Sequence, residues 1–219
     1  MTETLADPER ELALSYAKAA VRPYLQTLWM VDERFGTIVA GTTEAAIGEM
    51  RLLWWREAFA GIADDILAEP LLERVQECLT ATGSDGSEWG KMTEGWFALL
   101  QEPLEDQELE RFAMERGGRL FALSATLLTD AVPSFVGDCG RAWALTDLSC
   151  RVSDAAVGAR AQAMAQGIFT DIGRKTWPRD LRPLGALTVL ARRDSISNGR
   201  RQGAPARVAR MLWHRLSGR

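Results

Sequence analysis

Histidine and cysteine are both scarce in this chain of 219 residues, which has a single histidine, His214, and three cysteines. One histidine argues against a histidine-rich metal site and against a serine–histidine catalytic triad. Cys78, Cys139 and Cys150 are far apart and odd in number, so they predict neither a disulfide framework nor a metal site. We therefore expect a reducing, cytoplasmic location and no bound metal.

Long apolar runs and strand patterns are also missing. No run of about 18 apolar residues occurs, so we expect no membrane-spanning helix, and the acidic N-terminal segment does not resemble a signal peptide. No segment alternates with a period of two residues, and no hairpin turn separates β-branched runs. What remains is helical periodicity, which predicts an all-α domain of about nine helices.

Proline, glycine and capping residues place the ends of these helices. Gly117 and Gly118 interrupt a long predicted helix, and they predict a close helix approach or a kink because glycine costs about 1 kcal/mol of helix propensity. The segments predicted to be helical are 9–21, 24–39, 43–68, 71–82, 88–101, 106–129, 133–154, 155–172, 179–193 and 205–216.

Charge is distributed unevenly. The net charge is −4, yet the segment from Arg192 to the end holds eight arginines and one acid, so the rest of the chain carries about −11. We divide the chain into a helical domain, 1–194, and a basic C-terminal helix or tail, 195–219. Such a tail suits an anionic membrane surface or an acidic partner, and we expect no nucleic-acid partner.

Within the basic tail, an interfacial helix is one interpretation and a solvated tail is the other. The interfacial interpretation rests on apolar side chains beside cations. It assigns membrane or partner contact to Arg207, Arg210, Trp213 and Arg215.

The segment Ile47–Phe59 has the pattern of an amphipathic helix with an arginine inside its apolar face. On a helical wheel Met50, Arg51 and Trp54 share one stripe. An unpaired buried guanidinium is costly, so Arg51 needs a polar cavity or a carboxylate from another helix. Asp32 is the inward acid of the preceding helix, and we predict that it pairs with Arg51.

The same segment resembles a known family. Arg51-Leu-Leu-Trp-Trp-Arg-Glu-Ala-Phe59 is similar to the "RLQWWRDA"-type signature of the squalene/phytoene synthase family. Residues 22–36, 109–123, 140–151 and 181–194 are also similar to segments of that family. The sequence and its spacing are most similar to the branch of the family that contains the mitochondrial complex I assembly factor. The resemblance implies the isoprenoid synthase fold, an all-α bundle.

Enzymes of the family condense allylic diphosphates with Mg²⁺, which is held by two aspartate-rich motifs on facing helices. In this chain the first motif falls on Gly36 and Ala40 and the second on Val152 and Ala156. All four positions are predicted to face inward, and none is acidic. The faces are therefore retained without the metal ligands, and Mg²⁺ is expected only if the protein is active.

The remaining candidates each have two interpretations. Trp54 and Trp55 could line an apolar cavity for a prenyl chain or belong to an ordinary core. Asp65 could face the cavity or end a solvated helix before Pro70. Asp147 lies off the inward stripe and is predicted to be solvated.

The resemblance and the missing acids together predict a squalene/phytoene synthase-like protein without catalysis. It would bind a lipid or isoprenoid ligand, or act with respiratory complex subunits, in the cytoplasm and at the periphery of the inner membrane. The alternative is a prenyltransferase, an isoprenoid diphosphate transferase with a degenerate metal site.

Overall fold

The computed structural model describes residues 4–61, 69–197 and 200–219, and within these ranges it contains helices and no strand. The predicted all-α class is confirmed, and the predicted number of helices is close to the observed one. The elements are α1 (Pro8–Leu14), α2 (Arg22–Ala40), α3 (Ala45–Gly61), α4 (Pro70–Thr82), α5 (Gly86–Gly90), α6 (Thr93–Ala98), α7 (Asp106–Phe112), the π-helix η1 (Ala113–Gly118), α8 (Arg119–Leu128), α9 (Phe135–Ser149), α10 (Ala155–Ile172), the short 3-10 helix η2 (Arg179–Leu181), α11 (Arg182–Asp194) and α12 (Pro205–Ser217).

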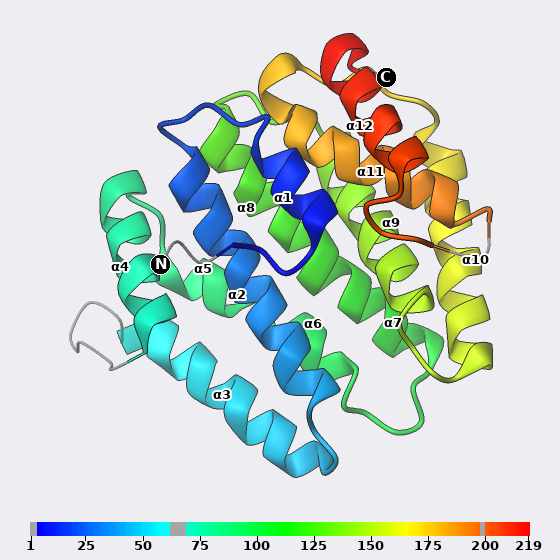
Figure 1. Ribbon diagram of the computed structural model, residues 1–219. Coiled ribbons are helices and arrows are strands. Elements are labelled where there is room, and N and C mark those ends of the chain that lie inside the picture. The colour runs from blue at the N-terminus through cyan, green and yellow to red at the C-terminus, as the bar shows by residue number, and fades with distance from the viewer. Residues whose placement is uncertain (1–3, 62–68, 198–199) are drawn as a thin grey trace.

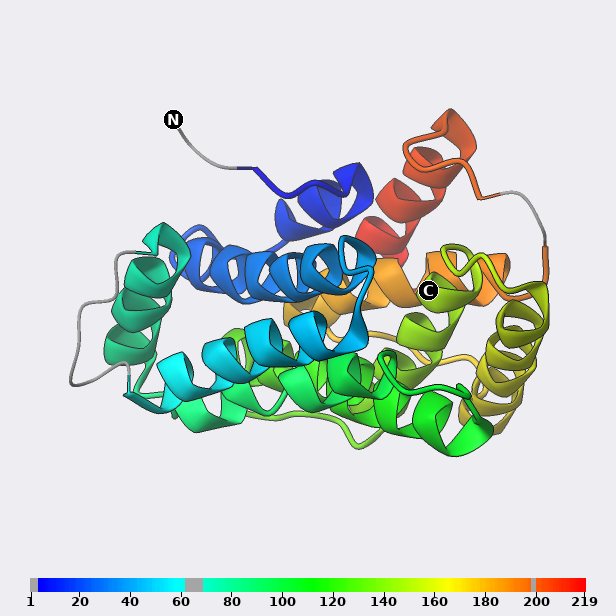
Figure 2. The ribbon, with the colours of Figure 1, turned by 90° about the horizontal axis from the view of Figure 1, so that it is seen from below.

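Helix α9 forms the centre of the bundle. It packs against η1, α8, α10 and α11, and most of its residues are buried. Helices α4 and α10 lie at opposite ends of the molecule in both views (Figures 1 and 2). Helices α1 and α12, from the two ends of the chain, lie on the same side of the bundle (Figure 2). The interior therefore lies between helices that are distant in sequence.

Glycines allow η1 to approach α9 closely. A Cβ atom at Gly117 would lie 2.2 Å from the Gly140 carbonyl oxygen, and one at Gly140 would lie 2.1 Å from the Gly117 carbonyl oxygen. No side chain fits between backbones at these distances. The predicted close approach is thus found at Gly117, and the π-helix that contains this residue turns Arg116 toward the interior.

Local sequence signals account for many helix ends. The Asp7 carboxylate accepts a hydrogen bond from the Glu9 amide at 2.8 Å and caps α1, and Asp154 caps α10 in the same way. Gly173 ends α10 with a φ of 66°, a conformation that glycine adopts without a steric cost. Helix α10 has the predicted bounds, 155–172.

Tertiary packing changed other boundaries. Helix α1 ends at Leu14 rather than at 21, and the predicted helix 88–101 is divided into α5 and α6. The long segment 106–129 remains helical throughout, as α7, η1 and α8. The final part of the predicted central helix, 62–68, lies outside the described residues, and so does the candidate Asp65.

Helix α12 is docked on the bundle. It packs against α11, and Met211 and His214 of α12 are both fully buried. The residues predicted as a basic tail therefore contribute part of the core. In the part of the chain that the structure describes, no helix has the length and apolarity needed to cross a membrane.

Candidate functional site

Asp32 of α2 is fully buried and is held by two arginines. The Arg116 guanidinium donates from Nε to Asp32 Oδ1 at 2.9 Å and from Nη2 to Oδ2 at 3.2 Å. Arg10 of α1 donates from Nη2 to the same Oδ2 atom at 2.5 Å. Both oxygens of the carboxylate are therefore engaged by cations from α1 and η1.

Asp147 of α9 completes this group. Arg116 Nη2 also donates to Asp147 Oδ2 at 3.0 Å, so one guanidinium joins the two acids. Arg151 and Arg200 donate to Asp147 Oδ1 at 2.9 and 2.8 Å. The prediction that Asp147 is solvated is wrong: it is 4% exposed. We call Arg10, Asp32, Arg116 and Asp147 the paired-arginine cluster.

Aromatic rings cover the cationic side of the paired-arginine cluster. The Arg116 guanidinium lies 4.3 Å from the centre of the Trp96 ring and 4.8 Å from that of Trp143. Arg10 lies 4.9 Å from the centre of the Trp143 ring. These contacts favour the charged state of the arginines in a site with little water.

The pKa values of the acids follow from this geometry. Burial by itself would raise the pKa of Asp32, but Arg116 and Arg10 outweigh it and hold that pKa below its usual range. Burial also works against the ionised form of Asp147, and the charges of Arg116, Arg151 and Arg200 lower the pKa of Asp147 strongly. Both acids are therefore ionised throughout the physiological pH range.

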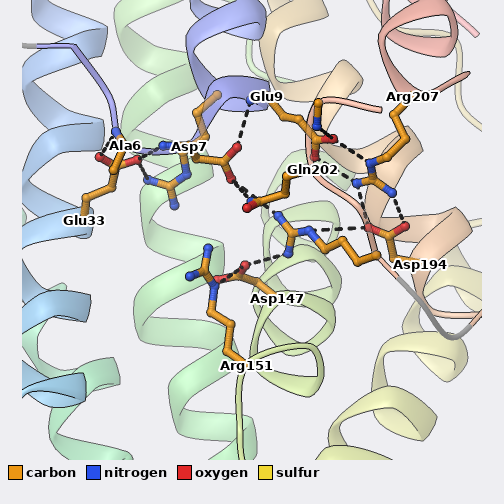
Figure 3. Close-up of polar contacts among 12 residues, drawn as sticks. Ala6, Asp7, Glu9, Glu33, Asp147, Arg151, Asp194, Gln202 and Arg207 are labelled. Atoms are coloured by element: carbon orange, nitrogen blue, oxygen red, sulfur yellow. Dashed lines mark hydrogen bonds and ion pairs between the residues drawn. The ribbon is translucent and has the colours of Figure 1, made fainter. Parts of the chain in front are cut away.

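A second network links α12 to the start of the chain. Arg207 donates from Nε and Nη2 to the two carboxylate oxygens of Glu9, at 2.5 and 2.8 Å, and from Nη2 to Asp194 at 2.9 Å. Figure 3 shows Arg207 between Glu9 and Asp194, with Asp147 and Arg151 alongside. The prediction that Arg207 contacts a membrane or a partner is wrong, because it is 6% exposed and paired inside the protein.

An open pocket of about 700 Å³ lies over the paired-arginine cluster, and we call it the central pocket. The paired-arginine cluster forms its polar floor. Gly36 lies in its wall, where a Cβ atom would approach the Trp96 ring to 3.0 Å. The remaining lining side chains are mixed. The larger group is apolar and includes Val39, Ala40, Trp96, Leu99, Leu104, Phe112, Leu148 and Val152, and the polar group consists of Asp7, Glu33, Thr37, Arg151, Ser153 and Gln202. The pocket thus combines a floor of paired acids and arginines with walls that are partly apolar and partly polar.

Three of the four positions at which the resemblance expects metal ligands line the central pocket. These are Gly36, Ala40 and Val152. Ala156 does not: it is exposed in the first turn of α10, so its prediction as an inward residue is wrong. The chain turns between α9 and α10 and carries this position away from the pocket.

The residues present in this pocket do not fit Mg²⁺. Magnesium requires oxygen ligands that are free to coordinate it. Four carboxylates line the central pocket, and each already accepts hydrogen bonds or ion pairs from side chains or backbone amides: Asp7, Asp32, Glu33 and Asp147. Within the described ranges there is also no group of three or more histidine, cysteine or acidic side chains that could hold a metal.

The predicted pairing of Arg51 with Asp32 is wrong. Arg51 is exposed on α3, and Asp32 has other partners. The helix is rotated relative to the prediction. Trp55 is the buried member of the pair and packs on Phe35, whereas Trp54 is 44% exposed. Neither tryptophan lines the central pocket.

Helix α3 therefore turns large apolar side chains outward. Met50, Leu53 and Trp54 are 65%, 36% and 44% exposed, and we call these three residues the α3 patch. Exposed apolar patches commonly mark sites of contact with a partner. On α12, Trp213 is 59% exposed, and Arg210 and Arg215 are exposed as predicted.

Sequence patterns do not identify Arg10 or Arg116 as partners of these acids. They place Arg200 in the basic tail as a candidate contact for anionic lipid, which is wrong, because Arg200 pairs with Asp147 inside the protein. Arg116 does carry a detectable signal, because it lies on the same stripe as Leu109, Phe112 and Leu120, which are buried. Arg116 thus shows the same pattern as Arg51, an arginine on an apolar helix face. Arg10 and Arg200 carry no such signal, since short segments and loops have no reliable stripe.

Comparisons with known proteins return nothing for this chain: it matches no protein-family model, no curated protein and no solved structure. The resemblance to squalene/phytoene synthases therefore stays a prediction.

Proposed function

We propose that this chain is a squalene/phytoene synthase-like protein that binds a ligand without catalysis. The central pocket would receive an isoprenoid or another apolar lipid chain. The protein would act at a membrane surface, in the assembly of a respiratory complex. The membrane and assembly roles rest on the resemblance and the basic C-terminal segment, and the binding role rests on the pocket.

One observation carries the proposal. The carboxylates that face the central pocket are neutralised by arginines, as Asp32 is by Arg10 and Arg116. A site that ionises an allylic diphosphate must stabilise the leaving diphosphate, and bound metal ions are the usual means. Here the expected ligand positions carry no acid, and the acids that do line the pocket are paired within the protein.

The shape and lining of the pocket agree with binding of an apolar chain. Ligand pockets typically have volumes of 300–1,000 Å³, and this one has about 700 Å³ with an apolar part to which Trp96, Leu99 and Phe112 contribute. The α3 patch supports a role in assembly, because it offers a second protein an exposed apolar surface.

Incubation with Mg²⁺ and farnesyl or geranylgeranyl diphosphate tests the absence of catalysis. We expect no release of pyrophosphate. Release of pyrophosphate that Asp32→Asn abolishes, with retained fold by circular dichroism, would instead establish the alternative, a transferase with a degenerate metal site.

Binding of farnesol, an uncharged isoprenoid, tests the pocket directly through quenching of tryptophan fluorescence. Val152→Trp should block the pocket and weaken binding about tenfold or more, because the new ring would occupy the apolar wall. Ala156→Trp is the matched control, since Ala156 is exposed and does not line the pocket. Equal binding by the two variants would contradict the assignment.

The assembly role is tested by deletion in the source organism. We expect lower NADH dehydrogenase activity of the respiratory chain, restored by the wild-type gene. Trp54→Ser in the α3 patch should restore it less well, whereas normal activity in the deletion strain would refute this part of the proposal.

A further inference from the structure

A second pocket, of about 490 Å³, lies between the connector 173–177, α11 and α12. We call it the α12 pocket. Its lining differs in charge from that of the central pocket: five cationic side chains converge on it, and among the described residues no aspartate or glutamate lines it. The five cations are Arg174, Lys175, Arg192, Arg210 and Arg219.

These cations lack acidic partners in the described part of the chain. Arg192 donates from Nη2 to the Gly173 carbonyl oxygen at 2.5 Å and lies over the Phe169 ring at 4.7 Å. Lys175 lies 5.9 Å from the centre of the Phe135 ring. Carbonyl and aromatic groups orient the cations, but they do not neutralise them.

Like charges in a concave site repel one another, and the pKa of Arg192 is lowered mainly by burial. Cys139 acts against this shift, and the charge of Arg174 contributes to it in a smaller measure. An anion in the pocket would remove the repulsion and gain several charge-assisted hydrogen bonds. The geometry thus favours a ligand that carries a phosphate or a similar group.

The surroundings of the α12 pocket indicate where that phosphate comes from. Trp213 stands at the rim and is 59% exposed. Leu212, which directly precedes Trp213, and Leu216, one turn further along α12, are 43% and 76% exposed. These two leucines line another hollow together with three further arginines: Arg179, Arg182 and Arg215.

An exposed apolar ridge between two basic hollows matches the interface of an anionic bilayer. Tryptophan and leucine side chains enter the boundary between headgroups and acyl chains, while arginines and lysines contact the phosphates. A soluble phosphate compound would not require the ridge. A protein partner would be expected to cover a ridge of this kind with apolar side chains, without needing five unpaired cations beside it.

We propose that the α12 pocket binds the phosphate of an anionic lipid headgroup while Leu212, Trp213 and Leu216 enter the bilayer interface. The phosphate contacts are inferred from the five cationic side chains that line the pocket. The location at a membrane rests on the proposed function, and this inference adds which surface of the protein faces the lipid.

The test is flotation of the full chain with vesicles. We compare vesicles of phosphatidylcholine alone with vesicles that also contain phosphatidylglycerol, at low and high salt. We expect binding only to the anionic vesicles, and weaker binding at high salt because surface charges are screened. Equal binding to neutral vesicles, or no binding to either, would overturn the inference.

A matched pair of variants separates the pocket from general electrostatic attraction. Arg174→Gln with Lys175→Gln removes two pocket cations and should weaken vesicle binding about tenfold or more. Arg193→Gln with Arg201→Gln removes the same charge from two exposed positions outside the pocket, and it should change binding by about twofold at most. Equal losses in the two variants would overturn the pocket assignment.

A second matched pair of variants tests the ridge formed by Leu212, Trp213 and Leu216. Trp213→Ser should weaken binding to anionic vesicles about fivefold or more, because Trp213 is proposed to enter the interface. Trp54→Ser, which removes an exposed tryptophan from α3, should leave vesicle binding unchanged. If Trp54→Ser has the larger effect, the wrong face of the protein has been assigned to the membrane.

Calorimetry with inorganic phosphate and with glycerol phosphate distinguishes the two sources of phosphate. Weak binding that competes with vesicles supports the inference. Tight binding of inorganic phosphate without any vesicle binding would overturn the lipid assignment. Vesicle binding together with pyrophosphate release from farnesyl diphosphate would overturn the proposed non-catalytic function and leave the headgroup site standing, so the two failures are distinguishable.

Discussion

The arginines beneath the central pocket and the arginines that line the α12 pocket lie in opposite electrostatic surroundings. Arg116 is buried between Asp32 and Asp147, whereas Arg174 and Arg210 face an open hollow that no acid of the described residues lines. The same residue type therefore stabilises the fold in one region and remains available for a ligand in the other. Counting arginines along the sequence does not separate these roles, but the positions of the acids do.

The largest effect is expected when a central acid of the paired-arginine cluster loses its charge. Asp32→Asn leaves Arg10 and Arg116 buried with too little negative charge and should lower the free energy of unfolding by about 3–5 kcal/mol. Urea denaturation measures the change. Asp106→Asn is the control: its ion pair with Arg160 is on the surface, and its loss should cost less than about 1 kcal/mol. Similar losses would contradict the contrast between buried and exposed pairs.

Helix α12 contains a buried, paired arginine, Arg207, and an exposed arginine of the α12 pocket, Arg210. Arg207→Gln removes the buried partner of Glu9 and Asp194, and it should lower the free energy of unfolding by about 3 kcal/mol. Arg210→Gln changes an exposed residue of the α12 pocket and should alter stability by less than about 0.5 kcal/mol. Thermal unfolding of the two variants side by side checks this, and a destabilised Arg210→Gln would show that the pocket cations also support the fold.

Helix α12 and the paired-arginine cluster should lose stability at different pH values. Burial of His214 lowers its pKa from 6.5 to about 4, so the unfolded chain binds a proton between these pH values and the folded chain does not. Stability should therefore fall by about 2–3 kcal/mol as the pH decreases from 6.5 to 4. Asp32, whose pKa is held below the usual 3.8, loses its contribution only at still lower pH. Denaturation of wild type and of His214→Leu across this range checks the prediction, because the variant should lose the histidine-dependent slope.

Of the four predictions of stability, the one for the contact between Gly117 of η1 and Gly140 of α9 should show the smallest effect. Gly140→Ala places a methyl group against the η1 backbone and should cost about 1–3 kcal/mol. Gly137→Ala, in the same helix but with open space around the new methyl group, should instead stabilise the protein by up to about 1 kcal/mol through helix propensity. Chemical denaturation of both variants tests this, and stabilisation by Gly140→Ala would contradict the close approach of α9 and η1.

The sequence determined by itself the helical class and many of the helix ends. Asp7 before Pro8, Asp154 before Ala155 and Gly173 after Ile172 act on their own backbone neighbours. Such signals operate within a few residues and do not depend on the rest of the fold. The close approach at Gly117 was also predictable, since a helix that tolerates glycine usually has a packing reason for it.

Only the tertiary structure decided which side of α3 is buried and which arginines are paired. Residues 52–55 of α3 are all large and apolar, so they cover most of the helical wheel and leave its orientation open. The packing of Trp55 on Phe35 fixed that orientation and turned Arg51 outward. Likewise, Asp32 meets Arg10 and Arg116 through contacts between residues 22 and 84 positions apart. A charged side chain is stabilised by whatever partner lies nearby in space, and that distance is set by the packing of whole helices rather than by the local sequence.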